Sequence, residues 1–249
     1  MSKISVIMSV YRRNRPDRNC PNLLRRAIES ILNQSFTDFE YILLDDASTD
    51  GSENVCREYA QKDSRIKYVR YDENSGCTAR RYNDGMKMAQ SPYFMYMFDD
   101  DYWYPHAMNS LYEATLSATP GFGMIYGLIN LVDWTTGEKI RGFGFRWDLK
   151  IIKQQNILGN LSVIVPRTTI NAVGGYDENP IFRRNCDWDL WVRIGEKFPV
   201  IRVPVMIGCS TSSFADSIGK TISQSKQDWE NVKIAQAKER KIRLQGELC

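Results

Sequence analysis

The sequence predicts an α/β fold built on a doubly wound, mostly parallel sheet, with a regular first half and an irregular second half. Short apolar runs typical of buried strands alternate with helical repeats through the first hundred residues. Acidic turns follow two of these runs, and the carboxyl ends of parallel strands meet at one edge of an open sheet, where ligands bind. Composition agrees, because 249 residues with 43% hydrophobic content can bury a full core.

The strands and helices of the first half follow one another in simple order. Predicted strands occupy residues 4–8, 41–44, 66–71 and 93–97, all short and apolar. One helix is predicted after Pro21, a second with Ser52 as its N-cap, and a third around Ala79 to Ala89. Successive units of this kind imply right-handed crossovers between parallel strands.

The second half has weaker patterns. Strands are predicted at 124–129 and 161–165, and Gly137 is typical of a hairpin turn leading to a strand at 139–141. Residues 173–176 predict a turn that needs its two glycines. A helix carrying Leu190, Trp191 and Ile194 follows, and a last helix is predicted over residues 225–248.

The run Asp99-Asp100-Asp101 is the most informative stretch of the chain. It follows the fourth predicted strand and precedes Pro105, which is typical of a helix start. Carboxylates this close repel one another unless a cation or several donors lie among them. Mg²⁺ or Mn²⁺ bound to a phosphate ester fits that requirement, and a solvated acidic turn is the alternative.

Two further acidic positions extend this interpretation. Asp45 and Asp46 end the second predicted strand, so the two acidic turns are expected at one edge, one for a base or ribose and one for metal-bound phosphates. Asp187 is predicted at or near a helix N-terminus, where backbone amides favour a carboxylate. Spacing alone leaves two roles open for Asp187, helix cap and general base.

Other features narrow the class of protein. The net charge of +3 is small and dispersed, which predicts no nucleic-acid partner. Six widely spaced cysteines form no C-x-x-C pair, and the single histidine, His106, is expected at the surface near a helix start. No apolar run could span a bilayer and none reads as a signal peptide, so a cytoplasmic protein is expected. Gly142-Phe143-Gly144 and Gly219-Lys220-Thr221 lack the other glycines of dinucleotide and P-loop motifs.

The chain resembles glycosyltransferase family 2 over about residues 3–207. The resemblance lies in residues 5–11, 27–40 and 45–52, in Asn74-Ser75-Gly76-Cys77-Thr78-Ala79-Arg80, in the acidic run, in Gly174-Gly175-Tyr176-Asp177-Glu178 and in residues 186–191. Over much of that length the chain is also similar to the spore-coat polysaccharide member of the family. The resemblance implies a GT-A fold, a nucleotide-sugar donor, a divalent metal (Mn²⁺ or Mg²⁺) and inverting transfer to an acceptor hydroxyl.

The same resemblance assigns roles to individual residues. Ser9 and Tyr11 would line a uracil site, Asp46 would accept a hydrogen bond from the base, and Arg80 would approach the diphosphate. Asp99 would face the ribose and the water shell of the metal, Asp100 would be the main metal ligand, and Asp101 would be a weaker candidate. Asp187 matches the general base. Cys186 replaces the acidic neighbour that is common in the family, so we expect less repulsion and a weaker base.

Three function classes follow from these residues. The first is a metal-dependent inverting transferase of the hexosyl or N-acetylhexosaminyl class, using a UDP-sugar and a carbohydrate or glycoconjugate acceptor in polysaccharide synthesis. The alternatives are a nucleotidyltransferase and a nucleotide-sugar-binding module without turnover. One GT-A domain is expected, with a nucleotide-binding half at 1–104, an acceptor half at 105–207 and a tail at 208–249. The tail helix would dock on its own domain, on a second subunit or on a membrane surface.

Overall fold

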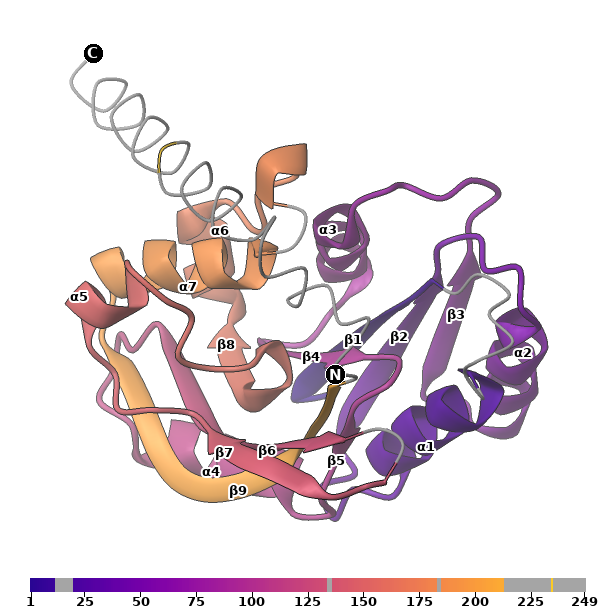
Figure 1. The fold of residues 1–249 in the computed structure, drawn as a ribbon, viewed down its shortest axis with the longest axis horizontal. Coiled ribbons are helices and arrows are strands. Elements are labelled where there is room, and N and C mark those ends of the chain that lie inside the picture. Colours follow the sequence, from indigo (N-terminus) through magenta and orange to yellow (C-terminus); the bar gives the residue numbers. More distant parts are fainter. Residues whose placement is uncertain (12–19, 134–135, 183–184, 213–233, 235–249) are drawn as a thin grey trace.

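The computed structural model (Figure 1) describes residues 1–11, 20–133, 136–182, 185–212 and 234. Apart from Ile234, the helix predicted at 225–248 therefore lies outside the described residues. Among the residues that are described, no helix is both long and apolar enough to cross a membrane.

Four parallel strands form the first half of the sheet, as predicted. They lie in the order β3-β2-β1-β4 and are β1 (Ile4–Val10), β2 (Phe39–Asp45), β3 (Ile66–Arg70) and β4 (Tyr93–Phe98). The connecting helices are α1 (Cys20–Leu32), α2 (Ser52–Lys62) and α3 (Thr78–Met88). This arrangement confirms the doubly wound first half.

Alternate side chains of β1 pack into two hydrophobic clusters, one on each face of the sheet. Val6 and Met8 pack with Leu24 of α1 and Val55 of α2, whereas Ile7 packs with residues of α3 and α7. Because successive strand residues point to opposite faces, one short strand supports both helical layers. Figure 1 shows α1 and α2 on one side of the strands and α3 on the other.

The second half continues the sheet with mixed strand directions. β8 (Val163–Pro166) is antiparallel to both β4 and β6 (Met124–Asp133), and β9 (Val200–Ser212) runs parallel to β6. Two strands lie at the edges of this half. β5 (Tyr102–Trp103) pairs with β9, and β7 (Lys139–Phe143) forms the predicted hairpin with β6. The helices of this half are α4 (Ala107–Ser117), α5 (Leu149–Ile152), α6 (Arg167–Val173) and α7 (Cys186–Lys197), with 3₁₀ turns at Asn160–Ser162 and Pro180–Phe182.

Several boundaries differ from the sequence-based prediction. Gly51, with φ of 91°, is the N-cap of α2 instead of Ser52, because the Asp50 carboxylate accepts the Ser52 N–H and makes Ser52 the first helical residue. α4 begins two residues after Pro105. β9 was not predicted at all, and it continues past residue 207 to Ser212, so the first residues of the predicted tail belong to the sheet.

Candidate active site

The two acidic turns lie at the same edge of the sheet, on either side of β1. Val10 of β1 is in register with Asp45 of β2, and Ser9 is in register with Phe98 of β4. Asp46 and Asp99 are the next residues of those two neighbouring strands, so both leave the sheet at the level where β1 ends. The register therefore confirms the shared edge that the sequence predicted.

The acidic run does not present three equivalent carboxylates. Asp99 and Asp100 are half-buried, whereas Asp101 is 2% exposed and its Oδ1 accepts the N–H of Thr211 at 2.8 Å. Burial is the main cause that raises the pKa of Asp101 well above its usual range, followed by the charge of Asp100. The Asp101 side chain thus fastens the acidic turn to the end of β9.

The backbone of the same turn is held from two directions. The main-chain oxygen of Asp100 accepts a hydrogen bond from Nη2 of Arg26 at 2.8 Å and another from the hydroxyl of Thr211. The guanidinium of Arg26 lies 4.5 Å from the ring centre of Tyr102, which follows the acidic run. Residues of α1, β5 and β9 therefore hold the acidic turn in place.

The donor set suits a hard cation only in part. Asp99 and Asp100 supply carboxylate oxygens, which Mg²⁺ and Mn²⁺ prefer, and such ions commonly take one or two carboxylates plus substrate phosphates. Within the described ranges, no group of three His, Cys, Asp or Glu side chains could hold a metal by itself. A divalent ion here fits if phosphate oxygens complete its coordination.

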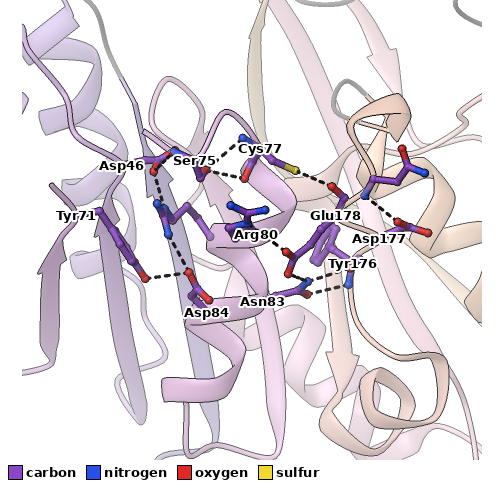
Figure 2. Close-up of polar contacts among 12 residues, drawn as sticks. Asp46, Tyr71, Ser75, Cys77, Arg80, Asn83, Asp84, Tyr176, Asp177 and Glu178 are labelled. Carbon is purple, nitrogen blue, oxygen red and sulfur yellow. Dashed lines mark hydrogen bonds and ion pairs between the residues drawn. The ribbon is translucent and has the colours of Figure 1, made fainter. Parts of the chain in front are cut away.

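Asp46 is surrounded by donors from α3 and from the loop before it, about 30 residues further along the chain. Oδ1 accepts hydrogen bonds from the N–H of Ser75 at 2.9 Å and from Nε of Arg81 at 2.6 Å. Oδ2 accepts hydrogen bonds from Nδ2 of Asn74 and from the Ser75 hydroxyl, both at 2.8 Å. The Asp46 and Arg81 side chains are 4% and 8% exposed. The carboxylate that was expected to read a base therefore also anchors a loop (Figure 2).

All three nitrogens of the Arg81 guanidinium donate hydrogen bonds, and the group also lies over an aromatic ring. Besides Nε on Asp46, Nη1 donates to Asp84 at 3.0 Å and Nη2 donates to the main-chain oxygen of Glu73 at 3.3 Å. The guanidinium carbon lies 3.4 Å from the ring centre of Tyr71. A buried charge is stable only when it is paired and fully hydrogen-bonded, and this geometry meets that condition. Sequence reasoning missed Arg81, since its neighbour Arg80 was the residue assigned to the ligand.

The opposite side of α3 contacts the second half of the chain. Nε of Arg80 donates to Oε2 of Glu178 at 3.2 Å. Nδ2 of Asn83 donates to Oε1 of the same carboxylate at 2.8 Å and to the main-chain oxygen of Tyr176 at 2.9 Å. Figure 2 shows these side chains pointing across from α3 to the loop that follows α6. Arg80 is 52% exposed on its side chain, so it lies near enough to solvent to reach a ligand.

The glycine pair at 174–175 explains how this loop reaches α3. Gly174 and Gly175 have φ of 82° and 74°, values that side chains other than glycine rarely adopt. A Cβ on Gly175 would lie 2.8 Å from Oδ1 of Asn83, which accepts the Tyr176 N–H. The predicted turn is thus confirmed, and its glycines allow close contact with α3.

Asp187 lies in the first turn of α7, as predicted. Asn185 is the N-cap, and Oδ1 of Asp187 accepts the N–H of Trp188 at 2.8 Å. Burial raises the pKa of Asp187 to about 6, although hydrogen bonds from the backbone and from the Asn156 side chain oppose the shift. Desolvation therefore raises the pKa of Asp187 without an acidic neighbour at Cys186, and the weaker base relative to other family members stays a prediction.

Tyr82 connects the two groups of carboxylates. Its hydroxyl donates to the main-chain oxygen of Met97, at the end of β4. Burial, and then the charges of Cys186, Asp187, Asp101 and Asp99, raise the pKa of Tyr82 well above its ordinary value. The ring centre of Tyr82 lies 6.1 Å from that of Phe98, the residue before Asp99, and Tyr82 shares a hydrophobic cluster with Cys186 and Trp188, the neighbours of Asp187.

Ser9 and Tyr11 lie where β1 ends. Ser9 is buried between Leu44 and Phe98, and Tyr11 is half-buried just after the strand. Residues 12–19 lie outside the described part of the chain, so the structure places only the start of this segment. Both side chains therefore lie at the edge shared by the acidic turns.

The chain matches the family model described as glycosyl transferase family 2 over residues 5–178. It is 25% identical to the Bacillus subtilis teichuronic acid biosynthesis glycosyltransferase TuaG over 182 residues, covering 73% of this chain and 70% of that protein. Glycosyltransferase GlyA of Streptococcus pneumoniae is 33% identical over 111 residues, covering 45% of this chain but only 15% of that protein. A Campylobacter jejuni GalNAc(5)-diNAcBac-PP-undecaprenol beta-1,3-glucosyltransferase is 29% identical over 165 residues, covering 65% of this chain and 50% of that protein.

Solved structures share the fold at low sequence identity. Staphylococcus aureus TarS 1–349 in complex with UDP has a TM-score of 0.64 and 18% identity, covering 85% of this chain and 61% of that one. The mannosyltransferase PcManGT from Pyrobaculum calidifontis, in complex with GDP-Man and Mn²⁺, has a TM-score of 0.62 and 16% identity, covering 88% of this chain and 59% of that one. The chain thus spans less than two thirds of either structure and has the fold of these enzymes, which is the GT-A fold predicted from sequence.

Proposed function

We propose that this chain, which belongs to glycosyltransferase family 2 by its match over residues 5–178, is a metal-dependent inverting glycosyltransferase. It moves a hexosyl or N-acetylhexosaminyl group from a UDP-linked donor to an acceptor hydroxyl. The observation that carries the proposal is the position of Asp187, a carboxylate with a pKa of about 6, between two residues of the cluster in which Tyr82 packs against Phe98, the residue before the acidic turn.

The donor would occupy the edge where β1, β2 and β4 end. Asp46 would contact the base, Ser9 and Tyr11 would line the same site, and Arg80 would donate charge-assisted hydrogen bonds to the diphosphate. Asp99 and Asp100 would hold Mn²⁺ or Mg²⁺. That ion, when bound, supplies Lewis-acid stabilisation for the negative charge on the departing phosphate.

Asp187 carries the proton transfer in this scheme. An acceptor hydroxyl loses its proton to the Asp187 carboxylate while its oxygen forms a bond to the anomeric carbon. The bond from that carbon to the diphosphate oxygen breaks, and its electron pair leaves with the nucleoside diphosphate. Attack from the face opposite the leaving group inverts the configuration. A pKa near 6 keeps Asp187 ionised at neutral pH while making it a stronger base than an exposed aspartate.

The acceptor is proposed to be a carbohydrate or glycoconjugate in polysaccharide synthesis. Support comes from two relatives, one named for teichuronic acid biosynthesis and one for transfer to a PP-undecaprenol-linked glycan. We infer that the irregular segment between β6 and β8 would contact this acceptor.

One assay tests the function and its alternatives together. The protein is incubated with a panel of nucleotide sugars, with Mn²⁺, Mg²⁺ or excess chelator, and release of nucleoside diphosphate is measured. We expect metal-dependent release of UDP, and NMR of the product should show an inverted anomeric centre. Pyrophosphate release from nucleoside triphosphates would instead indicate a nucleotidyltransferase, and binding without release would indicate a module without turnover.

A further inference from the structure

The guanidinium of Arg80 is held on one side and open on the other. Its Nε donates to Oε2 of Glu178 at 3.2 Å, and the Arg80 side chain is 52% exposed. Among the residues that the structure describes, none accepts a hydrogen bond from Nη1 or Nη2 of Arg80. A guanidinium carries N–H groups on all its nitrogens in one plane, so those of the two terminal nitrogens remain for a ligand.

The Glu178 carboxylate is itself fixed from the backbone. Its Oε1 accepts a hydrogen bond from Nδ2 of Asn83 at 2.8 Å. The Asn83 amide is bound at both ends to the main chain of Tyr176, because Oδ1 accepts the Tyr176 N–H and Nδ2 donates to the Tyr176 oxygen, each at 2.9 Å. A series of hydrogen bonds thus leads from the Tyr176 backbone through Asn83 and Glu178 to Arg80 (Figure 2).

The main chain of Glu178 also contacts the start of α3. Sγ of Cys77, the N-cap residue of α3, donates to the main-chain oxygen of Glu178 at 3.8 Å. An ordinary exposed ion pair contributes little, partly because two free side chains must be ordered to form it. Here Glu178 is already ordered by Asn83, so only Arg80 has to be fixed.

We propose that Glu178 is a positioning residue, which holds Arg80 by Nε and leaves both terminal nitrogens for the diphosphate of the donor. This inference rests on the proposed function, because it assumes that a nucleoside diphosphate contacts Arg80. Arginine binds phosphate most strongly through two parallel N–H···O bonds, which require a fixed guanidinium plane. A free arginine side chain loses rotamer freedom when it binds, and Glu178 removes part of that loss beforehand.

Glu178 has a second, opposite effect on the same arginine. As an anion it attracts Arg80 and repels a diphosphate, so removing its charge would tighten binding if that were its main effect. Both side chains are more than a third exposed, at 52% for Arg80 and 38% for Glu178, so water screens this charge. Ordering a long side chain is the larger contribution, and loss of the Glu178 carboxylate should therefore weaken diphosphate binding.

Glu178→Gln tests this sign on the full chain. Glutamine has one side-chain oxygen, so its amide nitrogen must face one of the two donors, Asn83 or Arg80. Calorimetry with Mn²⁺ present compares UDP with uridine, which has no phosphate. We expect UDP to bind about fivefold more weakly and uridine to bind as it does to the parent. Asp177→Asn makes the same charge change one residue earlier, keeps an acceptor for the Asn179 N–H, and should bind UDP like the parent.

A double-mutant cycle shows whether the effect acts through Arg80. Arg80→Met has no guanidinium to position, so Glu178→Gln should not weaken UDP binding further in that background. Arg80→Lys keeps the charge but has a single nitrogen, so none is left free when Glu178 binds it. It should bind UDP about fivefold more weakly than the parent. Melting temperatures check that each variant is folded.

The outcomes separate this proposal from the proposed function. If the parent binds UDP and Glu178→Gln binds it equally or more tightly, the positioning role is overturned. An equal loss in the Arg80→Met background, or an equal loss for uridine, would give Glu178 a structural role in its loop instead. If Glu178→Gln does not fold, Arg80→Lys that binds UDP like the parent overturns the proposal. A parent that binds neither UDP nor uridine overturns the proposed function and this inference with it.

Discussion

Replacing Asp187 by asparagine should stabilise the protein while it removes catalysis. Burial raises the pKa of Asp187 from 3.8 to about 6, so the folded protein holds this carboxyl less favourably in its charged form than the unfolded chain does. At about 1.36 kcal/mol per pKa unit, a shift of about 2 units costs at most about 3 kcal/mol. Asparagine keeps the size and an acceptor for the Trp188 N–H without the charge.

The pH dependence of this gain follows from proton binding. Between about pH 4 and pH 6 the folded protein binds more protons at Asp187 than the unfolded chain, so this group makes stability fall as pH rises. The penalty is complete above pH 6 and absent below about pH 4. Asp187→Asn should therefore melt up to about 6–12 °C higher than the parent at pH 8, using about 2–4 °C per kcal/mol for this size. The two proteins should melt together at pH 4.

Transfer rates provide the second half of the test. If Asp187 is the base, transfer should fall by about 10²–10⁴, and the parent activity should rise with pH through about 6. Nucleotide affinity should be unchanged. A melting difference that is equal at pH 4 and pH 8 would refute the cost of burying the charge. Near-normal transfer by the variant would instead leave Asp187 with a structural role only.

Four other substitutions test the remaining site. Asp100→Ala should abolish turnover and Mn²⁺-dependent UDP binding with little change in melting temperature. Asp101→Ala should instead cost about 1–3 kcal/mol in urea unfolding, because the half-buried N–H of Thr211 loses its acceptor. Equal effects of the two substitutions would contradict their different positions. Asp46→Ala should destabilise the fold by about 3–5 kcal/mol, since it leaves the buried Arg81 charge unpaired. Arg80→Met should weaken UDP binding about tenfold without lowering the melting temperature, because its ion pair with Glu178 is exposed; unchanged affinity would rule out contact with the diphosphate.

The sequence predicted the first half of the fold because its patterns are local. Each strand of that half is a short apolar run, and the parallel order follows from the alternation with helices. β9 carried a comparable signal, since Ile201, Val203, Val205 and Ile207 alternate with other residues. Pro204 stands inside this run, and proline is disfavoured within a strand because it has no N–H to donate. The short helices α5 and α6 have no such period, although Asp148 caps the start of α5 and Gly174 ends α6.

The site was predictable in its carboxylates but not in the contacts that hold them. The position of acidic turns after buried strands identifies Asp45-Asp46 and Asp99-Asp100-Asp101 as groups, and the family resemblance assigns roles to the individual residues. Nothing local shows that Asp46 would meet donors from residues 74–81, because that encounter depends on how the loop before α3 folds back over β2. The same holds for Asp101, whose burial against Thr211 required a strand that the sequence did not reveal.

Arg80 and Arg81, at the start of α3, contact different parts of the chain because of helical geometry. Successive residues of a helix point about 100° apart, so Arg81 faces Asp46 in the first half of the chain while Arg80 faces Glu178 in the second half. Asn83 adds a second contact to Glu178 from the same side as Arg80. A rigid helix of 11 residues thus connects the carboxylate proposed to contact the base with the loop that leads to Asp187. A substitution that shifts α3 should therefore change base binding and proton transfer together, whereas a change confined to Arg80 should affect only the diphosphate.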